Sequence, residues 1–287
     1  MRLLKSSIKF SLLFFVVILS NLPGTEVEWL PHGSFFPTRF LDPTACQQGI
    51  SVLSYKVDDH QKELMYVPVS LSMQQQLLRT GNGDEARYEL GMEFSVFSQF
   101  SVVDAGEAFM GGLQNADYRV SAVAHIQGDE NTHYRISLFH QSSHLGDDYI
   151  IRNSITTPTL RTLNYEQVDL ILSKNVSGYR LYGGGGYNVS PNTIRDRIML
   201  QGGIDHSILL NAYPGISIIS GFDLKVYEHN DYTPNLRVGF GTEITGNSQA
   251  TYKILLSWYR GRLPYSTLEY QKVSLLGLSL IIDLHKE

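Results

Sequence analysis

The chain has 287 residues, of which 43% are hydrophobic and 18% charged, and its formal net charge is -5 at pH 7. This length fits one barrel or one large domain, and the acidic balance leaves no basic surface for nucleic acid. The 17 Tyr and 13 Phe suit the aromatic girdles of a membrane β-barrel; an aromatic-rich soluble β-protein is the alternative.

The first predicted element is a cleaved secretory signal peptide over residues 1–24. Basic residues precede an apolar run from Phe10 to Leu19, and about ten apolar residues are too few to span a bilayer. Cleavage is expected between Ser20 and Thr25, and a retained amphipathic anchor is the alternative. Residues 25–46 show no alternation, so an irregular segment is predicted there. It ends at Cys46, the only cysteine, which excludes an intrachain disulfide.

Alternating segments then repeat to the end of the chain, and the predicted barrel occupies residues 47–287. Twelve strands are predicted, an even number as a single-chain bacterial barrel requires. They cover 47–58, 63–77, 85–102, 115–127, 132–144, 163–174, 178–189, 194–206, 215–227, 234–245, 250–261 and 270–284. Short turns such as GDEN, NVSG and TGNS recur at every second connection, and longer loops are expected at 103–114, 145–162 and 262–269. Short turns on one rim and long loops on the other are typical of outer-membrane barrels.

Alternation alone does not distinguish a soluble sandwich from a membrane barrel. A sandwich exposes its polar faces to water, whereas a membrane barrel exposes its apolar faces to lipid. In a barrel the charged faces would gather in the lumen and nearly neutralise one another, which favours a blocked interior over a narrow channel. The expected lumen charges are Arg87, Arg119, Arg135, Arg180, Arg197, Lys225, Arg237, Lys253, Glu89, Glu93, Asp117, Asp169, Asp205, Asp223 and Glu243.

The segment from Tyr134 to Asp148 carries the candidate chemistry. The period of two that places Tyr134 and Leu138 on an apolar face also places His140 and Ser142 there. A serine nucleophile needs an imidazole at its hydroxyl, and residues two apart on a strand share one face.

Glu166 has the parity of the apolar residues on the next strand, so it is expected to face outward beside His140. A carboxylate on the lipid face is costly without a partner, and a third group would orient the imidazole. The alternative is that these side chains are interfacial polar residues without catalytic function.

Metal sites are weaker predictions. His140 and His144 stand about 13 Å apart in an extended strand, too far to share one zinc ion. Asp147 and Asp148, followed by loop carbonyls, predict a calcium site, with an exposed acidic loop as the alternative. No other cofactor is predicted.

Several blocks resemble the bacterial family called domain of unknown function 1207. They are QNADYRVSA at 114–122, FHQSSHLGDDYIIR at 139–152, YEQVDLILS at 165–173, YRLYGGGGY at 179–187 and GFDLK at 221–225. The likeness runs from about Phe35 to about Leu280. It implies an exported outer-membrane-type barrel and brings no established activity.

The H-x-S pair resembles the catalytic pair of outer-membrane phospholipase A and of the outer-membrane lipid A deacylase. By that resemblance Ser142 would be the nucleophile, His140 the base and Glu166 the orienting group. Both families tend to follow the serine with Asn, whereas Ser143 and His144 follow it here.

The final strand resembles the C-terminal signal recognised by the barrel-assembly machinery, although the usual terminal aromatic residue is absent. The predicted partners are this machinery and outer-membrane lipid, and the predicted location is the outer membrane. Three hypotheses remain open. The first is an ester hydrolase acting on phospholipid or lipid A, and the second is a non-catalytic barrel that acts in envelope structure, surface interaction or narrow transport. The third is a soluble carbohydrate-binding sandwich.

Overall fold

The computed structural model describes residues 26–57, 64–81, 87–104, 109–156, 163–190, 195–246 and 250–284. The predicted signal peptide lies outside these residues. The described helices include none that is long and apolar enough to cross a membrane.

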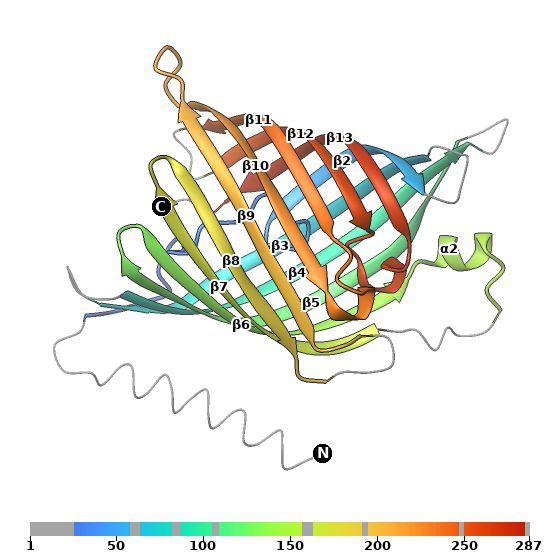
Figure 1. The fold of residues 1–287 in the computed structure, drawn as a ribbon, viewed down its shortest axis with the longest axis horizontal. Coiled ribbons are helices and arrows are strands. Elements are labelled where there is room, and N and C mark those ends of the chain that lie inside the picture. Colours follow the sequence, from blue (N-terminus) through green and yellow to red (C-terminus); the bar gives the residue numbers. More distant parts are fainter. Residues whose placement is uncertain are drawn as a thin grey trace.

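The wall is a closed antiparallel barrel of twelve strands, β2 to β13 (Figure 1). Each strand pairs with its neighbours in sequence, and the ring closes between β2 and β13. The strands are β2 (Gln48–Val57), β3 (Leu64–Thr80), β4 (Arg87–Asp104), β5 (Phe109–Asp129), β6 (Thr132–Leu145), β7 (Leu163–Val176), β8 (Tyr179–Asn188), β9 (Ile198–Leu209), β10 (Ile216–Tyr227), β11 (Asn235–Thr245), β12 (Thr251–Arg262) and β13 (Lys272–Asp283).

All twelve predicted strands are present. The main difference is at β5, which begins at Phe109, so the expected loop over 103–114 is largely strand. The sequence pattern also missed β1 (Val27–Trp29), which pairs with Leu78–Thr80 of β3. Three residues are too few to show a periodicity of two.

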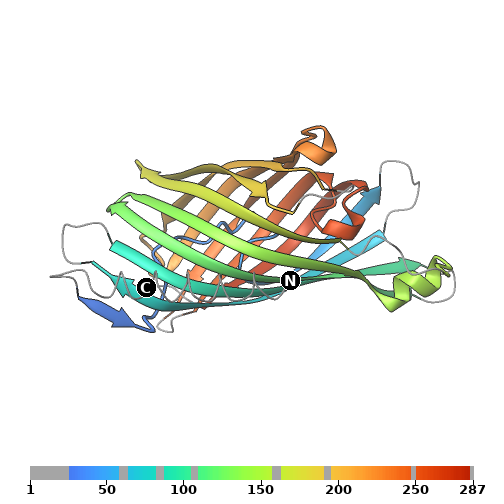
Figure 2. The same cartoon turned by 90° about the horizontal axis from the view of Figure 1, so that it is seen from below.

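The two rims differ as the turn pattern predicted. We call the rim with the connections β5–β6 and β7–β8 the short-turn rim; each of these connections has two residues. At the opposite, long-loop rim, helix α2 (Asp147–Arg152) follows β6, and the 3-10 helices η1 (Glu228–Asn230) and η2 (Ser266–Leu268) lie in later loops. Figure 2 shows α2 at one end of the molecule, where β5 and β6 extend toward it.

Apolar side chains cover the outside of the wall. This confirms the arrangement predicted for a membrane barrel, with apolar faces outside and charged faces inside. Exposed on the outer face are Val52, Leu71, Phe94, Val120, Ile136, Leu138, Leu170, Leu200, Phe222, Phe240, Leu256, Leu276 and Leu278. Charged side chains are buried in the lumen, among them Glu93, Asp117, Arg135, Asp223, Lys225, Arg237 and Lys253. Such a surface suits hydrocarbon and not water.

One residue assigned to the lumen from the sequence lies elsewhere. Arg197 is exposed, and its guanidinium donates a hydrogen bond to the hydroxyl of the outward-facing Tyr187 at 2.6 Å. It precedes β9 in a loop, so the strand parity used in the prediction does not apply to it.

The lumen is filled by residues 31–47, which we call the plug. Phe40 and Leu41 pack against Ile219, Leu255 and Ile281 of the inner wall. A Cβ on Gly239 would lie 2.6 Å from Cδ2 of Leu41, so a larger residue there would displace this side chain of the plug. The irregular segment predicted before the barrel therefore forms part of its interior.

The plug carries its own charge network. Asp42 accepts hydrogen bonds from Lys225 at 2.8 Å and Gln201 at 3.0 Å, and Arg39 lies 3.2 Å from it. Burial opposes ionisation of Asp42, but the charges of Lys225 and Arg39 outweigh it and hold the pKa of that carboxyl well below its usual range. Backbone carbonyls contribute as well, because the Thr44 carbonyl accepts from Arg119 at 2.9 Å.

A second segment, residues 263–271, closes the long-loop end, and we call it the cap. Glu269 of the cap is buried and pairs with Arg195 at 3.0 Å, while Asn230 donates to the same carboxylate at 3.0 Å. The cap also belongs to an apolar cluster that includes Tyr66, Phe97 and Leu275 of the inner wall. Plug and cap meet across a cavity of about 20 Å³, room for about one water molecule.

Asp42→Asn should destabilise the barrel by about 3–5 kcal/mol, because it leaves Lys225 as an unpaired buried charge. Since the folded pKa of Asp42 is depressed, its stabilisation is present above the unfolded value of about 3.9 and is lost as the pH falls through the folded value. Unfolding in detergent, followed by circular dichroism between neutral and acidic pH, measures both effects. Asp196→Asn, at an exposed position, is the control; equal stability of the two variants contradicts the prediction.

Candidate functional site

The outer face of β6 changes from apolar to polar near the long-loop rim. Tyr134, Ile136 and Leu138 are exposed apolar residues, and His140, Ser142 and His144 continue the same face. On β7, Glu166 lies directly opposite His140, and Asn164 lies opposite Ser142. We call these five polar side chains the outer-wall patch: His140, Ser142, His144, Asn164 and Glu166.

His140 and Glu166 are in contact. The Nδ1 atom of His140 lies 2.7 Å from Oε1 of Glu166, and both side chains are about half exposed. A proton on Nδ1 would be donated to the carboxylate, which leaves Nε2 as the basic nitrogen. The predicted pairing of these two residues across neighbouring strands is therefore present.

Glu166 is held from its other side by Ser190, which follows β8. The Ser190 hydroxyl donates to Oε2 of Glu166, and the backbone amide of Glu166 donates to the Ser190 hydroxyl oxygen at 3.0 Å. Ser190 is itself fixed, because its amide donates to the Asn188 side chain at 3.1 Å. The carboxylate thus has a defined orientation toward His140.

Ser142 has a different partner from the one expected. Its hydroxyl oxygen lies 2.6 Å from Nε2 of His144, and among the described residues this imidazole, not that of His140, is its hydrogen-bond partner. The His144 ring packs edge-on against Tyr118 of β5, with centroids 5.9 Å apart. Ser142 therefore stands between two imidazoles, each two residues away on the same strand.

Asn164 completes the surroundings of Ser142. It is exposed and stands directly across from Ser142 in the register of β6 and β7. Its side-chain amide forms no hydrogen bond with the residues that the structure describes. A serine hydroxyl, a nearby imidazole and a free amide donor on one exposed surface are the groups that ester cleavage uses.

The two acidic residues predicted for calcium begin helix α2. The Asp148 carboxylate accepts the backbone amide of Leu113 at 2.9 Å. Within the described ranges, no three His, Cys, Asp or Glu side chains gather as metal ligands. The calcium site at Asp147 and Asp148 stays a prediction.

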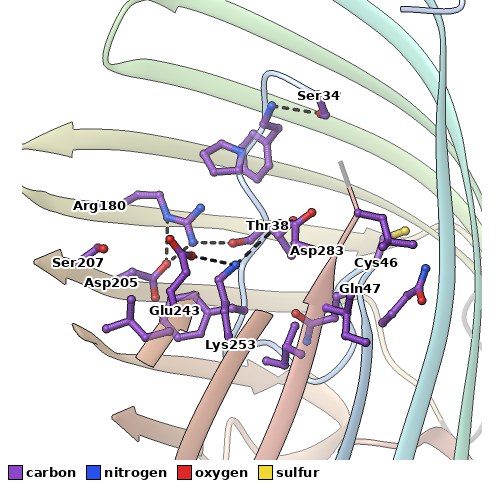
Figure 3. A pocket seen from close by; sticks show the side chains of 18 of the residues that line it. Ser34, Thr38, Cys46, Gln47, Arg180, Asp205, Ser207, Glu243, Lys253 and Asp283 are labelled. Atoms are coloured by element: carbon purple, nitrogen blue, oxygen red, sulfur yellow. Dashed lines mark hydrogen bonds and ion pairs between the residues drawn. The ribbon is translucent and has the colours of Figure 1, made fainter. Parts of the chain in front are cut away.

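A cavity of about 550 Å³ lies at the short-turn rim beside the plug (Figure 3). Its charges are largely paired: Arg180 pairs with Asp205, and Lys253 lies 3.1 Å from Glu243 and 3.9 Å from Asp283. Cys46 also lines it, and burial raises the pKa of its thiol to about 12. That thiol is protonated at neutral pH, so it does not supply a nucleophile.

Sequence reasoning found three members of the patch and missed the roles of two. His144 has the parity of His140, so the pattern placed it on the right face without indicating its contact with Ser142. The position of Asn164 opposite Ser142 depends on how the 17-residue connection after β6, residues 146–162, sets the register of β7. A loop of that length does not fix the register in advance.

Solved structures with a similar fold include outer membrane phospholipase A from Escherichia coli. An active-site mutant of that enzyme aligns with a TM-score of 0.57 and 9% identity, covering 92% of this chain and 93% of the other. The Salmonella typhi outer membrane phospholipase, a dimer with bound calcium, gives a TM-score of 0.51 and 10% identity, covering 82% and 90%. Identities this low show a shared outer-membrane barrel fold and nothing further.

No curated protein matches the sequence. Residues 18–283 match the family described as a protein of unknown function (DUF1207), which is most of the 287-residue chain. The expected resemblance is therefore confirmed, and the chain belongs to the DUF1207 family.

Proposed function

We propose that this protein resides in the outer membrane, with its long-loop rim outside the cell, and hydrolyses an ester of a membrane lipid. The observation that carries the proposal is the position of the outer-wall patch. Ser142 and two imidazoles lie immediately beyond the apolar belt that ends at Leu138. A lipid ester lies at that depth, between acyl chains and head group, so the substrate needs no access to the filled lumen.

In the proposed reaction, the Ser142 hydroxyl attacks the ester carbonyl and transfers its proton to an imidazole. The tetrahedral intermediate collapses as the imidazolium protonates the leaving alcohol, and an acyl group remains on Ser142. Water, deprotonated by the same imidazole, then releases the fatty acid and restores the serine. The two phospholipases with a similar fold support the choice of substrate class.

His140 is the proposed base because Glu166 orients it and offsets the charge that it gains. Rotation of Ser142 about one side-chain bond carries its hydroxyl from the His144 side toward the His140 side. His144, whose ring packs against Tyr118, then holds the resting hydroxyl. Glu166 supports the imidazolium through the 2.7 Å contact with Nδ1.

The filled lumen counts against the transport alternative. Phe36, Phe40 and Leu41 of the plug are buried, as is Leu268 of the cap. A non-catalytic barrel remains the competing hypothesis, and the variants below separate it from a hydrolase.

Ser142→Ala should lower fatty-acid release by about 10³-fold or more, because the nucleophile is lost. Purified protein in detergent is assayed with phosphatidylethanolamine micelles and, separately, with lipid A. Ser54→Ala, an exposed serine on the outer face of β2, is the matched control and should keep full activity. Both proteins should show the same heat-modifiable migration. If the native protein releases no fatty acid from either lipid, in calcium or in EDTA, the hydrolase proposal is wrong; a loss in EDTA alone supports the calcium site.

His140→Ala and His144→Ala decide which imidazole is the base. We expect His140→Ala to lower kcat by about 10³-fold and Glu166→Gln by about 10²-fold, since the neutral amide no longer offsets the imidazolium charge. His144→Ala should cost about tenfold or less. The pH profile of kcat should lose its ascending limb only in the variant that removes the base. The reverse pattern assigns the base to His144 and overturns the role of His140.

Asn164 is positioned to donate a hydrogen bond to the oxyanion that forms at the ester carbonyl. Asn164→Ala should lower kcat by about 10²-fold with little change in KM, because one such donor acts mainly in the transition state. Asn164→Asp should be at least as damaging, since a carboxylate repels the oxyanion. Equal kcat in Asn164→Ala and the native protein removes Asn164 from the mechanism and leaves Ser142 unaffected.

A further inference from the structure

Four basic side chains gather on the outer wall at the long-loop rim, away from the outer-wall patch. Lys56 of β2, Lys272 of β13 and Arg260 and Arg262 of β12 form this group, which we call the basic cluster. The strand register places them together. Arg260 pairs with Ser274, which pairs with Lys56, and Arg262 pairs with Lys272. They therefore lie in two successive rows of outward-facing residues across three adjacent strands.

The basic cluster stands directly above an apolar wall. One outward position below Arg260 is Trp258, which is paired with Leu276, and the exposed Leu256 and Leu278 follow. On β2, Ser54 and then the exposed Val52 lie below Lys56 on the same face. The change from apolar to polar side chains marks the membrane boundary, as it does near His140 on the other side of the ring. These cations therefore lie at head-group depth.

Within the described part of the chain, these four side chains lack the acidic partners that several basic residues of the lumen have. Arg135, Lys225 and Lys253 in the lumen each form an ion pair with a carboxylate. By contrast, no carboxylate of the described residues pairs with any member of the basic cluster. Arg262 donates to the Tyr270 carbonyl at 3.0 Å, while its Nε atom is buried and has no acceptor among the described residues. The absence of carboxylate partners beside four neighbouring positive charges favours an anionic ligand at this surface.

We propose that the basic cluster binds the phosphate groups of a lipid A-type glycolipid in the outer leaflet. Arginine donates two parallel hydrogen bonds to a phosphate, and the lysines add point charges. Acyl chains of the same molecule lie along Leu256, Leu276 and Leu278. The apolar wall below the cations is the reason for choosing a lipid over free phosphate.

The proposed glycolipid site does not depend on the hydrolase. In the ring, β12, β13 and β2 are separated from β6 and β7 by β3, β4 and β5 on one side and by β8 to β11 on the other. Binding at the basic cluster therefore leaves the outer-wall patch open. The site requires only that the long-loop rim face the outer leaflet.

The test uses the purified full chain in detergent and measures binding of lipid A with two phosphates, monophosphoryl lipid A and dephosphorylated lipid A. The quadruple variant Lys56→Gln, Arg260→Gln, Arg262→Gln, Lys272→Gln should bind the bisphosphorylated lipid at least tenfold more weakly, since it removes four positive charges that attract the anionic head group. Lys174→Gln, an exposed cation of β7 near the short-turn rim, is the matched control and should bind normally.

Affinity should fall from bisphosphorylated to monophosphoryl to dephosphorylated lipid A, and added salt should weaken the first most. Inorganic phosphate should compete only at millimolar concentration. Equal binding of the three lipids, or an unchanged affinity in the quadruple variant, overturns the proposal. Binding of inorganic phosphate as tight as that of lipid A overturns the lipid assignment. Heat-modifiable migration of the variant shows that its barrel is intact, and unchanged fatty-acid release separates this result from the hydrolase.

Discussion

The requirement that every backbone polar group be satisfied inside a bilayer governs this structure. Only a closed ring of strands meets it without helices that span, and the pairing of β2 with β13 supplies the closure. In a closed ring, successive residues of each strand face alternately outward and into the lumen. Leu276 and Leu278 therefore face outward, while Ser279 faces the lumen. Ion pairs and hydrogen bonds compensate the buried charges of the interior: Arg135 pairs with Glu93 at 2.7 Å, and Arg237 donates to Ser279 at 3.1 Å.

The interior shows how a barrel of this size avoids an open channel. The plug reaches from the short-turn rim to Lys225 near the far end of β10, and the cap descends from the opposite side. A substrate therefore has easier access to side chains on the outer wall than to side chains in the lumen. The outer-wall patch and the basic cluster both lie where the apolar belt ends, on different sides of the ring. In the proposed outer-membrane location, both would lie next to lipid.

The strands were predictable because a period of two is a local signal, and twelve repeats of it leave few alternatives. The plug was not predictable: Phe36, Phe40 and Leu41 show no period, and their partners come from distant strands. Apolar lumen residues such as Ile219 and Leu255 make sense only once the plug is in place. At the candidate site, parity placed His140, Ser142 and Glu166 outward. The choice between His140 and His144 as partner of Ser142 depends on side-chain rotation, which parity does not encode.

The central claim is that the apolar wall faces hydrocarbon and the charged face is enclosed. Spin labels at Leu278 and Ser279, each on a Cys46→Ser background and reconstituted in bilayers, test it most directly. These neighbours are 59% and 2% exposed. The account predicts that the label at residue 278 collides freely with oxygen and not with a water-soluble nickel chelate, while the label at 279 is shielded from both. A label at residue 278 that is open to the nickel chelate would contradict the account.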